Sequence, residues 1–320
     1  ALVLIAVFVF WMRRNAIQLQ RFRSPELNGT PKKDANYILY FEVVLMTLFL
    51  LMNASDLHLQ NVPGGYSHFI KAGSFPISQF IEPLFNGMSN ELVMLLSELF
   101  WWLHIIGIYA FMNYLPYSKH LHIVLAFPNA YYAPLIPSGT LHNMPDIQNE
   151  VLYAMQPELA PSNAAAPESF GAKEATELSW KNLMDAYSCT ECGRCSAACP
   201  ANSTGKLLSP RKIMMDTRDR LETVGKNIDA NGQFVDDGKS LLNDHITIEE
   251  LRACTTCNAC VEECPVSISP MDIIIELRRS LIMEDSNAPS EWNGMFSNIE
   301  NNFAPWKFAP DDRDAWTKQS

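Results

Sequence analysis

Residues 189–200 read CTECGRCSAACP, and residues 254–265 read CTTCNACVEECP. Each stretch has the form C-x2-C-x2-C-x3-C-P, and together they hold all eight cysteines of the 320-residue chain. Two-residue gaps let three thiolates converge from one tight loop, while the fourth cysteine, followed by proline, reaches the other cluster. The spacing therefore predicts two [4Fe–4S] clusters.

The predicted ligand sets are crossed between the two stretches. One cluster takes Cys189, Cys192, Cys195 and Cys264, and the other takes Cys254, Cys257, Cys260 and Cys199. Zinc held by four thiolates is the alternative, but such sites use pairs of cysteines separated by a longer stretch. Two runs of three closely spaced cysteines favour iron–sulfur clusters.

Charge and hydropathy divide the chain. Residues 1–128 carry 8 Lys and Arg against 7 Asp and Glu, whereas residues 129–320 carry 16 against 28. The strong acidity of the second half argues against a nucleic-acid partner. The long apolar runs all belong to the first half, which indicates a membrane domain.

Three apolar runs predict membrane spans, at residues 1–12, 37–57 and 92–115. The first is too short to cross a bilayer, so we expect the protein to continue upstream of Ala1. The connection at 58–91 has Lys71 as its one basic residue, whereas the connection at 13–36 contains Arg13, Arg14, Arg21, Arg23, Lys32 and Lys33. The positive-inside rule places the basic connection, and with it every cysteine, on the cytoplasmic side.

The predicted fold is mainly α: a transmembrane helical bundle followed by an α-helical dicluster ferredoxin domain. The expected divisions are a membrane domain at 1–130, a linker at 131–177, the dicluster domain at 178–290 and an extended C-terminal arm at 291–320. Apolar residues recur at helical spacing around the cysteines, and strand alternation is hard to find. Thr247 and Glu250 predict a capping box for the short helix before Cys254.

Three histidines accompany the third span. His104 and His122 are 18 residues apart, so a continuous helix puts both on one face about 27 Å apart. Such a pair suits axial ligation of two b-type haems stacked across the membrane, with Gly107 near the same face. His120 lies on another face and is a further candidate. The alternative is that these side chains form hydrogen bonds within the bundle or mark the interface, and the spacing leaves both interpretations open.

The chain resembles the heterodisulfide reductase-related (Fe–S)-binding membrane proteins of bacteria, which join a nitrate reductase gamma-like membrane domain to a helical dicluster domain. The resemblance rests on ILYFEVVLMTLFLLMNASDLHLQ, IKAGSFPISQF, WWLHIIGIYAFMNYLPYSKHLHIVLAFPN, YSCTECGRCSAACPAN, LSPRKIMMDTRDRL and ACTTCNACVEECPVSI. It implies a five-helix membrane domain whose last helix gives one histidine, His104 or His122, to each of two b haems. It also implies that the first two helices, with the other haem ligands, lie upstream of Ala1.

The expected function is electron transfer in the bacterial cytoplasmic membrane. Electrons are expected to move between a quinone, two b haems, the two clusters and a cytoplasmic oxidoreductase of the CCG or flavoprotein type. The sequence contains no CCG motif of its own, and no chain residue is predicted to perform acid–base or nucleophilic catalysis. The alternative is a membrane-tethered redox sensor or assembly factor without haem, although no kinase, DNA-binding or nucleotide-binding pattern is found.

Overall fold

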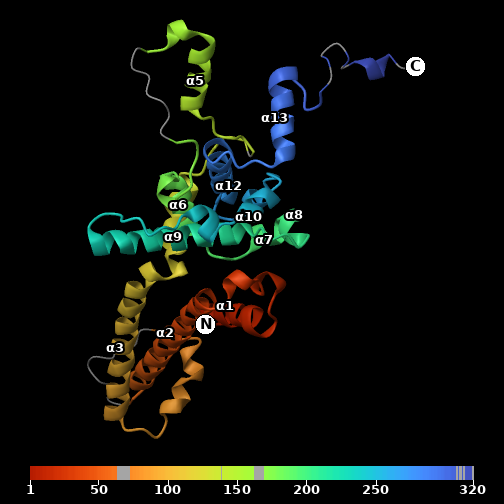
Figure 1. The fold of residues 1–320 in the computed structure, drawn as a ribbon. Coiled ribbons are helices and arrows are strands. Elements are labelled where there is room, and N and C mark those ends of the chain that lie inside the picture. The colour runs from red at the N-terminus through yellow and green to blue at the C-terminus, as the bar shows by residue number, and fades with distance from the viewer. Residues whose placement is uncertain are drawn as a thin grey trace. The chain divides into compact units, whose positions relative to one another are not determined.

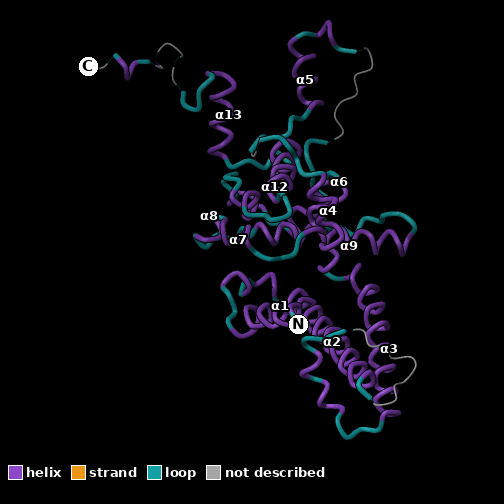
Figure 2. Tube along the Cα trace, turned by 180° about the vertical axis from the view of Figure 1, so that it is seen from behind, coloured by secondary structure: helices purple, strands orange, loops and turns teal. Residues whose placement is uncertain are grey.

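The computed structural model describes residues 1–62, 73–137, 139–161, 169–307, 309, 312 and 314–318 (Figure 1). Within these ranges the regular structure is helical and contains no β-strand (Figure 2). The prediction of a mainly α protein is confirmed.

Contacts along the chain define two units that interleave in sequence. The first contains Ala1–Ala133, Met184–Cys199 and Glu263–Ile268; the second contains Pro134–Leu183, Pro200–Glu262 and Ser269–Ser320. The first cysteine group and Cys264 therefore belong to the unit that contains the apolar helices. Cys254, Cys257 and Cys260 belong to the other unit. The domain boundaries expected from sequence stay predictions.

The first unit is built on an antiparallel pair of helices, α2 (Thr30–Gln60) and α3 (Asn90–Tyr114), which lie side by side in both views (Figures 1 and 2). The Phe41 ring lies 5.5 Å from that of Phe111 near one end, whereas Leu59 and Val93 share a buried cluster near the other. Helix α1 (Leu2–Trp11) contacts α2.

Two helical segments, Thr30–Gln60 and Asn90–Tyr117, are long and apolar enough to cross a membrane. In their most apolar windows only 17% and 11% of the residues are buried inside the structure. Large side chains such as Trp102, Ile106 and Met112 are exposed instead. Such an outward apolar surface suits a lipid environment rather than water.

The helix does not continue from His104 to His122, so the expected single face is wrong. A 3₁₀ turn at Leu115–Tyr117 follows α3, Ser118 is extended with φ −116° and ψ 151°, and α4 begins at His122 and ends at Tyr131. Pro116 lacks an amide donor for the helix. The Ser118 hydroxyl and the Lys119 amide instead donate to the Asp34 carboxylate, at 2.8 and 3.1 Å.

Short helices surround the cysteine groups: α6 (Trp180–Ser188), α7 (Arg194–Ala198), α8 (Pro200–Ser203), α9 (Pro210–Asn231), α10 (Ile248–Ala253), α11 (Ala259–Glu262) and α12 (Pro270–Arg279). In the second unit α9, α10 and α12 enclose a core that includes Ile213, Leu251, Ile273 and Leu277. The capping box of Thr247 and Glu250 is confirmed, with both reciprocal hydrogen bonds present.

The linker expected at 131–177 includes a helix, α5 (Pro145–Met155), and its residues 162–168 lie outside the described part of the chain. The expectation of an extended C-terminal arm needs correction. The arm expected to be extended begins with α13 (Ser290–Asn302). Apolar residues at Trp292, Met295, Phe296 and Ile299 follow the i, i+3, i+4, i+7 spacing of a helix, and this signal explains the difference.

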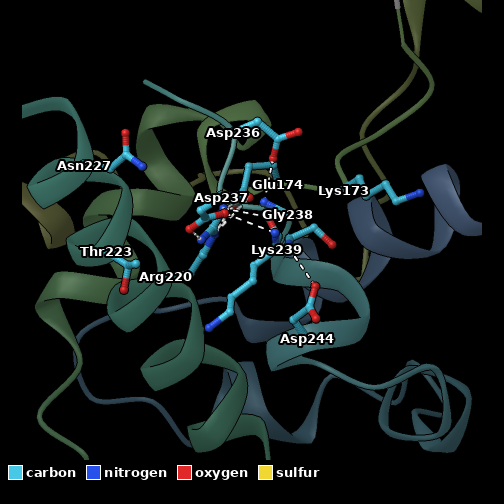
Figure 3. A network of polar contacts seen from close by, with 12 residues as sticks. Lys173, Glu174, Arg220, Thr223, Asn227, Asp236, Asp237, Gly238, Lys239 and Asp244 are labelled. Carbon is cyan, nitrogen blue, oxygen red and sulfur yellow. Dashed lines mark hydrogen bonds and ion pairs between the residues drawn. The ribbon is translucent and has the colours of Figure 1, made fainter. Parts of the chain in front are cut away.

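Arg220 ties three segments of the second unit together. Its side chain, on α9, is fully buried and donates to both Glu174 and Asp237, with nitrogen–oxygen distances of 2.7 and 2.6 Å. It also donates to the carbonyl of Lys239 at 2.7 Å. Figure 3 shows both carboxylates turned toward this guanidinium. The forked geometry of arginine satisfies several acceptors at once, so the loops before α6 and after α9 are held on the helix.

We predict that Arg220→Met lowers the free energy of unfolding by about 2–3 kcal/mol, because two carboxylates lose their shared donor. Lys226 is exposed on the same helix, and Lys226→Met is expected to change stability by less than about 0.5 kcal/mol. Anaerobic denaturant unfolding of both variants measures the difference. Equal stability of the two variants contradicts a stabilising role for the Arg220 network.

Candidate iron–sulfur centres

The two cysteine loops share one backbone conformation. Glu191 and Gly193 have φ of 57° and 74°, and the equivalent Thr256 and Asn258 have φ of 53° and 64°. A β-branched residue such as Thr256 rarely adopts positive φ without a functional reason. Left-handed residues alternating with right-handed ones point successive N–H groups to one side and form a concave anion site of the kind found at iron–sulfur clusters.

Backbone amides already approach the cysteine sulfurs. The amide of Thr256 donates to Cys254 Sγ, and that of Ile268 donates to Cys264 Sγ, both at 3.4 Å. Such hydrogen bonds stabilise thiolates and tune the potential of a bound cluster. The loop shape and the donor set therefore fit the predicted clusters.

Within the first unit, Cys192 and Cys264 lie near one another. Burial raises the pKa of the Cys264 thiol, the amides of Val266 and Ile268 lower it, and the neighbouring Cys192 raises it again. Their proximity agrees with the crossed assignment of Cys264 to the first group. For the second cluster, the structure places Cys199 in the first unit and its three expected co-ligands in the second, so that set stays a prediction.

Among the described residues, no three or more Cys, His, Asp or Glu side chains are arranged to hold one metal ion. A zinc site requires four ligands on a single ion. A cubane instead gives each of its four iron atoms one thiolate, so the sulfurs surround a larger volume. The preference for clusters over zinc therefore rests on the spacing of the cysteines.

A buried ion pair joins the first loop to the segment that follows α3. Lys119 Nζ pairs with the carboxylate of Glu191, and the two side chains are 6% and 2% exposed. Lys119 Nζ also donates to the carbonyl of Pro31 at 2.7 Å. Burial lowers the pKa of the Lys119 ammonium, and the attraction of Glu191 opposes this. A charged pair with so little water access depends on both partners.

Two further contacts connect the first group to the segments around the apolar helices. Asn129, fully buried on α4, donates through Nδ2 to the carbonyl of Val266 at 2.9 Å, two residues beyond Cys264. Helix α7, which carries Cys195, contacts the 3₁₀ turn Gln20–Phe22. Both chain segments that carry the first ligand set are therefore held by the apolar unit.

The second loop has a different environment. Thr255, Thr256 and Cys257 are exposed, whereas Cys189 and Glu191 are buried. The second loop is held from beneath by Arg278 of α12, whose Nη2 donates to the carbonyl of Cys254 at 2.6 Å. The two loops thus have similar φ angles at equivalent positions but differ in exposure and in the residues that contact them.

The histidines predicted as haem ligands are each oriented by a carbonyl. His104 Nδ1 lies 3.0 Å from the carbonyl oxygen of Leu45, and His122 Nδ1 lies 2.8 Å from that of Lys119. A carbonyl can only accept, so Nδ1 carries the proton and Nε2 keeps a lone pair. This is the tautomer that a metal-binding imidazole needs. Both side chains are half-buried and fit the role of axial ligands.

The other candidates near these histidines are placed differently. The ring of His120 lies 5.3 Å from that of Phe111 and 5.7 Å from that of His122. A Cβ on Gly107 would lie 2.6 Å from a methyl carbon of Leu45. The absence of a side chain at Gly107 therefore leaves room for the Leu45 side chain of α2.

Sequence reasoning missed Lys119, Glu191 and Asn129. One signal was available, since Glu191 places a carboxylate between two thiolate ligands where the second group has Thr256. Carboxylate and thiolates of like charge repel, so a nearby cation could have been expected. The sequence does not indicate that this cation is Lys119.

Comparison with known proteins supports an iron–sulfur protein. Residues 188–268 match the family described as a 4Fe-4S dicluster domain. Over its full length the chain is 28% identical to a probable iron-sulfur-binding oxidoreductase, FadF, of Bacillus subtilis, of which it covers 45%. It is 28% identical to an EtfAB:quinone oxidoreductase of Syntrophomonas wolfei, with 92% of this chain and 42% of that protein aligned.

A third relative is one subunit of a ferredoxin/F(420)H(2)-dependent CoB-CoM heterodisulfide reductase from Methanosarcina acetivorans. It is 36% identical over 33% of this chain and 52% of its own length. The chain thus spans about half the length of these curated relatives. No solved structure matches. The chain therefore carries a 4Fe–4S dicluster domain and is homologous to iron–sulfur oxidoreductases and to this heterodisulfide reductase subunit.

We predict about eight iron and eight acid-labile sulfide per chain after anaerobic purification, because two cubanes are bound. Removal of the iron with a chelator is expected to unfold the loops, since the thiolates then lose the metal that holds them together. Metal analysis and amide hydrogen exchange measure both effects. Stoichiometric zinc without sulfide contradicts the assignment.

Proposed function

We propose that this chain is the membrane-anchored electron-transfer subunit of a quinone-linked oxidoreductase. It relays electrons between the quinone pool, two b haems, two [4Fe–4S] clusters and a partner oxidoreductase of the CCG or flavoprotein type. The site lies at the bacterial cytoplasmic membrane with the clusters on the cytoplasmic side. The substrate-converting chemistry belongs to the partner.

The observation that carries the proposal is the repeated cysteine motif on two loops of equal shape. A bound cubane supplies one-electron redox chemistry through its iron and inorganic sulfur. The chain contributes thiolate ligands, amide donors to sulfur and burial, which set the potential. Two such centres in one domain suit a relay, because electrons can pass from one to the other.

Membrane anchoring is supported by the helices of the first unit. Both α2 and α3 are long, apolar and largely unburied within the chain, as helices that face lipid are. The six basic residues between positions 13 and 36 support a cytoplasmic location for that end of the pair.

Haem binding is supported by the orientation of His104 and His122, whose Nε2 atoms are unprotonated in the tautomer that the carbonyls select. Loaded haem would add a one-electron centre inside the membrane arm. Quinone as the other substrate is supported by the similarity to an EtfAB:quinone oxidoreductase over 92% of this chain.

We predict that the protein purified from its native membrane shows b-type haem bands that are reduced by quinol. His104→Ala is expected to remove one haem and to stop quinol-driven cluster reduction, because the axial nitrogen is lost. His142→Ala serves as the control, since His142 is exposed in the second unit. Difference spectra and haem extraction measure the result.

Two outcomes contradict the proposal in different ways. Unchanged haem content in His104→Ala removes the ligand assignment. Clusters without any haem in the wild-type protein, and no reduction by quinol, favour a redox sensor or assembly factor instead.

A further inference from the structure

The first unit contains, besides the apolar helices, every ligand expected for one of the two clusters. Cys189, Cys192, Cys195 and Cys264 all belong to it, whereas three of the four ligands of the other cluster do not. The two clusters are therefore not equivalent with respect to the membrane arm, although their motifs are the same.

Three contacts fix this first site on the apolar unit. They are the Lys119–Glu191 ion pair, the hydrogen bond from Asn129 to the Val266 carbonyl, and the packing of α7 on Gln20–Phe22. Each contact reaches a different part of the ligand set: the loop before Cys192, the stretch after Cys264 and the helix that carries Cys195. A rigid placement follows, since three separate points define an orientation.

A short bonded path runs from the membrane histidine to the first loop. His122 Nδ1 donates a hydrogen bond to the carbonyl of Lys119, and the side chain of Lys119 pairs through Nζ with Glu191. Glu191 precedes Cys192 directly in the chain. The predicted haem ligand and the predicted cluster ligand are thus joined through Lys119 alone and one ion pair.

Comparison with the second loop shows which contacts are specific to the first loop. Thr256 occupies the position of Glu191 and has nearly the same φ, yet it is exposed and uncharged. If Glu191 were needed only to shape its loop, an equivalent buried carboxylate would be expected at position 256. A buried carboxylate that meets a lysine from the apolar unit appears in the first group alone.

We infer that the cluster held by Cys189, Cys192, Cys195 and Cys264 is the one that exchanges electrons with the membrane arm. Lys119 and Glu191 are the positioning residues that hold it there. The other cluster, with its exposed loop at Thr255–Cys257, then serves the soluble partner. This order rests on the proposed function. In each transfer one electron leaves the membrane donor, which is oxidised, and enters the first cluster, which is reduced; no bond forms or breaks.

The test compares variants that each neutralise one charge. Glu191→Gln and Lys119→Met each remove one partner of the ion pair, and Lys226→Met, at an exposed position on α9, is the control. The protein is purified from its native membrane together with any bound subunits and is embedded in nanodiscs. It is then reduced either by quinol or by dithionite, and the reduction of the clusters is followed by freeze-quench EPR. We expect Glu191→Gln to slow quinol-driven reduction by about tenfold to 10²-fold, the loss that a small misplacement causes. The rate of reduction by dithionite and the iron content are expected to stay unchanged, and Lys226→Met is expected to behave as the wild type with both reductants.

A second readout needs no electron transfer. Amide hydrogen exchange of residues 189–193 is expected to rise in Glu191→Gln and Lys119→Met, while exchange of residues 254–258 stays as in the wild type. The double variant with Lys119→Glu and Glu191→Lys restores opposite charges and is expected to recover part of the quinol-driven rate. A purely structural weakness would lower the iron content and slow both reductants equally.

If the Glu191 and Lys119 variants fail to assemble the first cluster, a variant that lacks a ligand of the second cluster tests the inferred order instead. In Cys257→Ala, quinol is expected still to reduce the first cluster at the wild-type rate. Loss of that reduction, or equal slowing by Lys226→Met and Glu191→Gln, overturns the inferred order. A wild-type protein that takes no electrons from quinol overturns the proposed function instead, while the exchange measurement still reports whether the ion pair positions the loop.

Discussion

A negatively charged loop has to be held beside the end of an apolar helix pair, and the Lys119–Glu191 ion pair is the contact that permits it. Glu191 lies between two cysteines that bind metal as thiolates, so three anionic groups are close in sequence. Unpaired, such a carboxylate would be too costly to bury. Lys119 supplies the compensating charge, and its own position depends on Asp34 and Pro31 at the start of α2. The ends of α2 and α3 and the first loop therefore form one connected polar structure.

The two cysteine loops have the same cysteine spacing and similar φ angles but lie in different surroundings. They share left-handed residues at matching positions, because both must direct amides toward sulfur. Outside the loops the similarity ends. The first half has Glu191 buried against a lysine, and the second half is held by Arg278 through the Cys254 carbonyl. The backbone conformation of each loop suits a bound cluster, whereas the side chains around each loop differ with the elements that pack against it.

Much of this architecture could be predicted from local patterns. Helical apolar spacing, the capping box of Thr247 and the cysteine spacing each depend on residues close in sequence, and the structure or the family match supports them. The break between His104 and His122 was harder, because Pro116 can either kink a helix or end it. The outcome depends on Asp34, which is more than 80 residues away and accepts from Ser118 and Lys119. The ion pair of Lys119 with Glu191 joins positions 72 residues apart, and no local period reports such a contact.

Helix α2 is 31 residues long and therefore about 46 Å from end to end. The hydrocarbon layer of a bilayer is only about 30 Å thick, so an upright α2 extends beyond it by about 16 Å, or roughly ten residues. Lys32, Lys33 and Asp34 then stand at the depth of the lipid headgroups. In the proposed arrangement Lys32 and Lys33, which are exposed, can pair with lipid phosphate groups, while Asp34 accepts hydrogen bonds from Ser118 and the Lys119 amide. The extra length of α2 then keeps the buried ion pair of Lys119 and Glu191 outside the hydrocarbon layer.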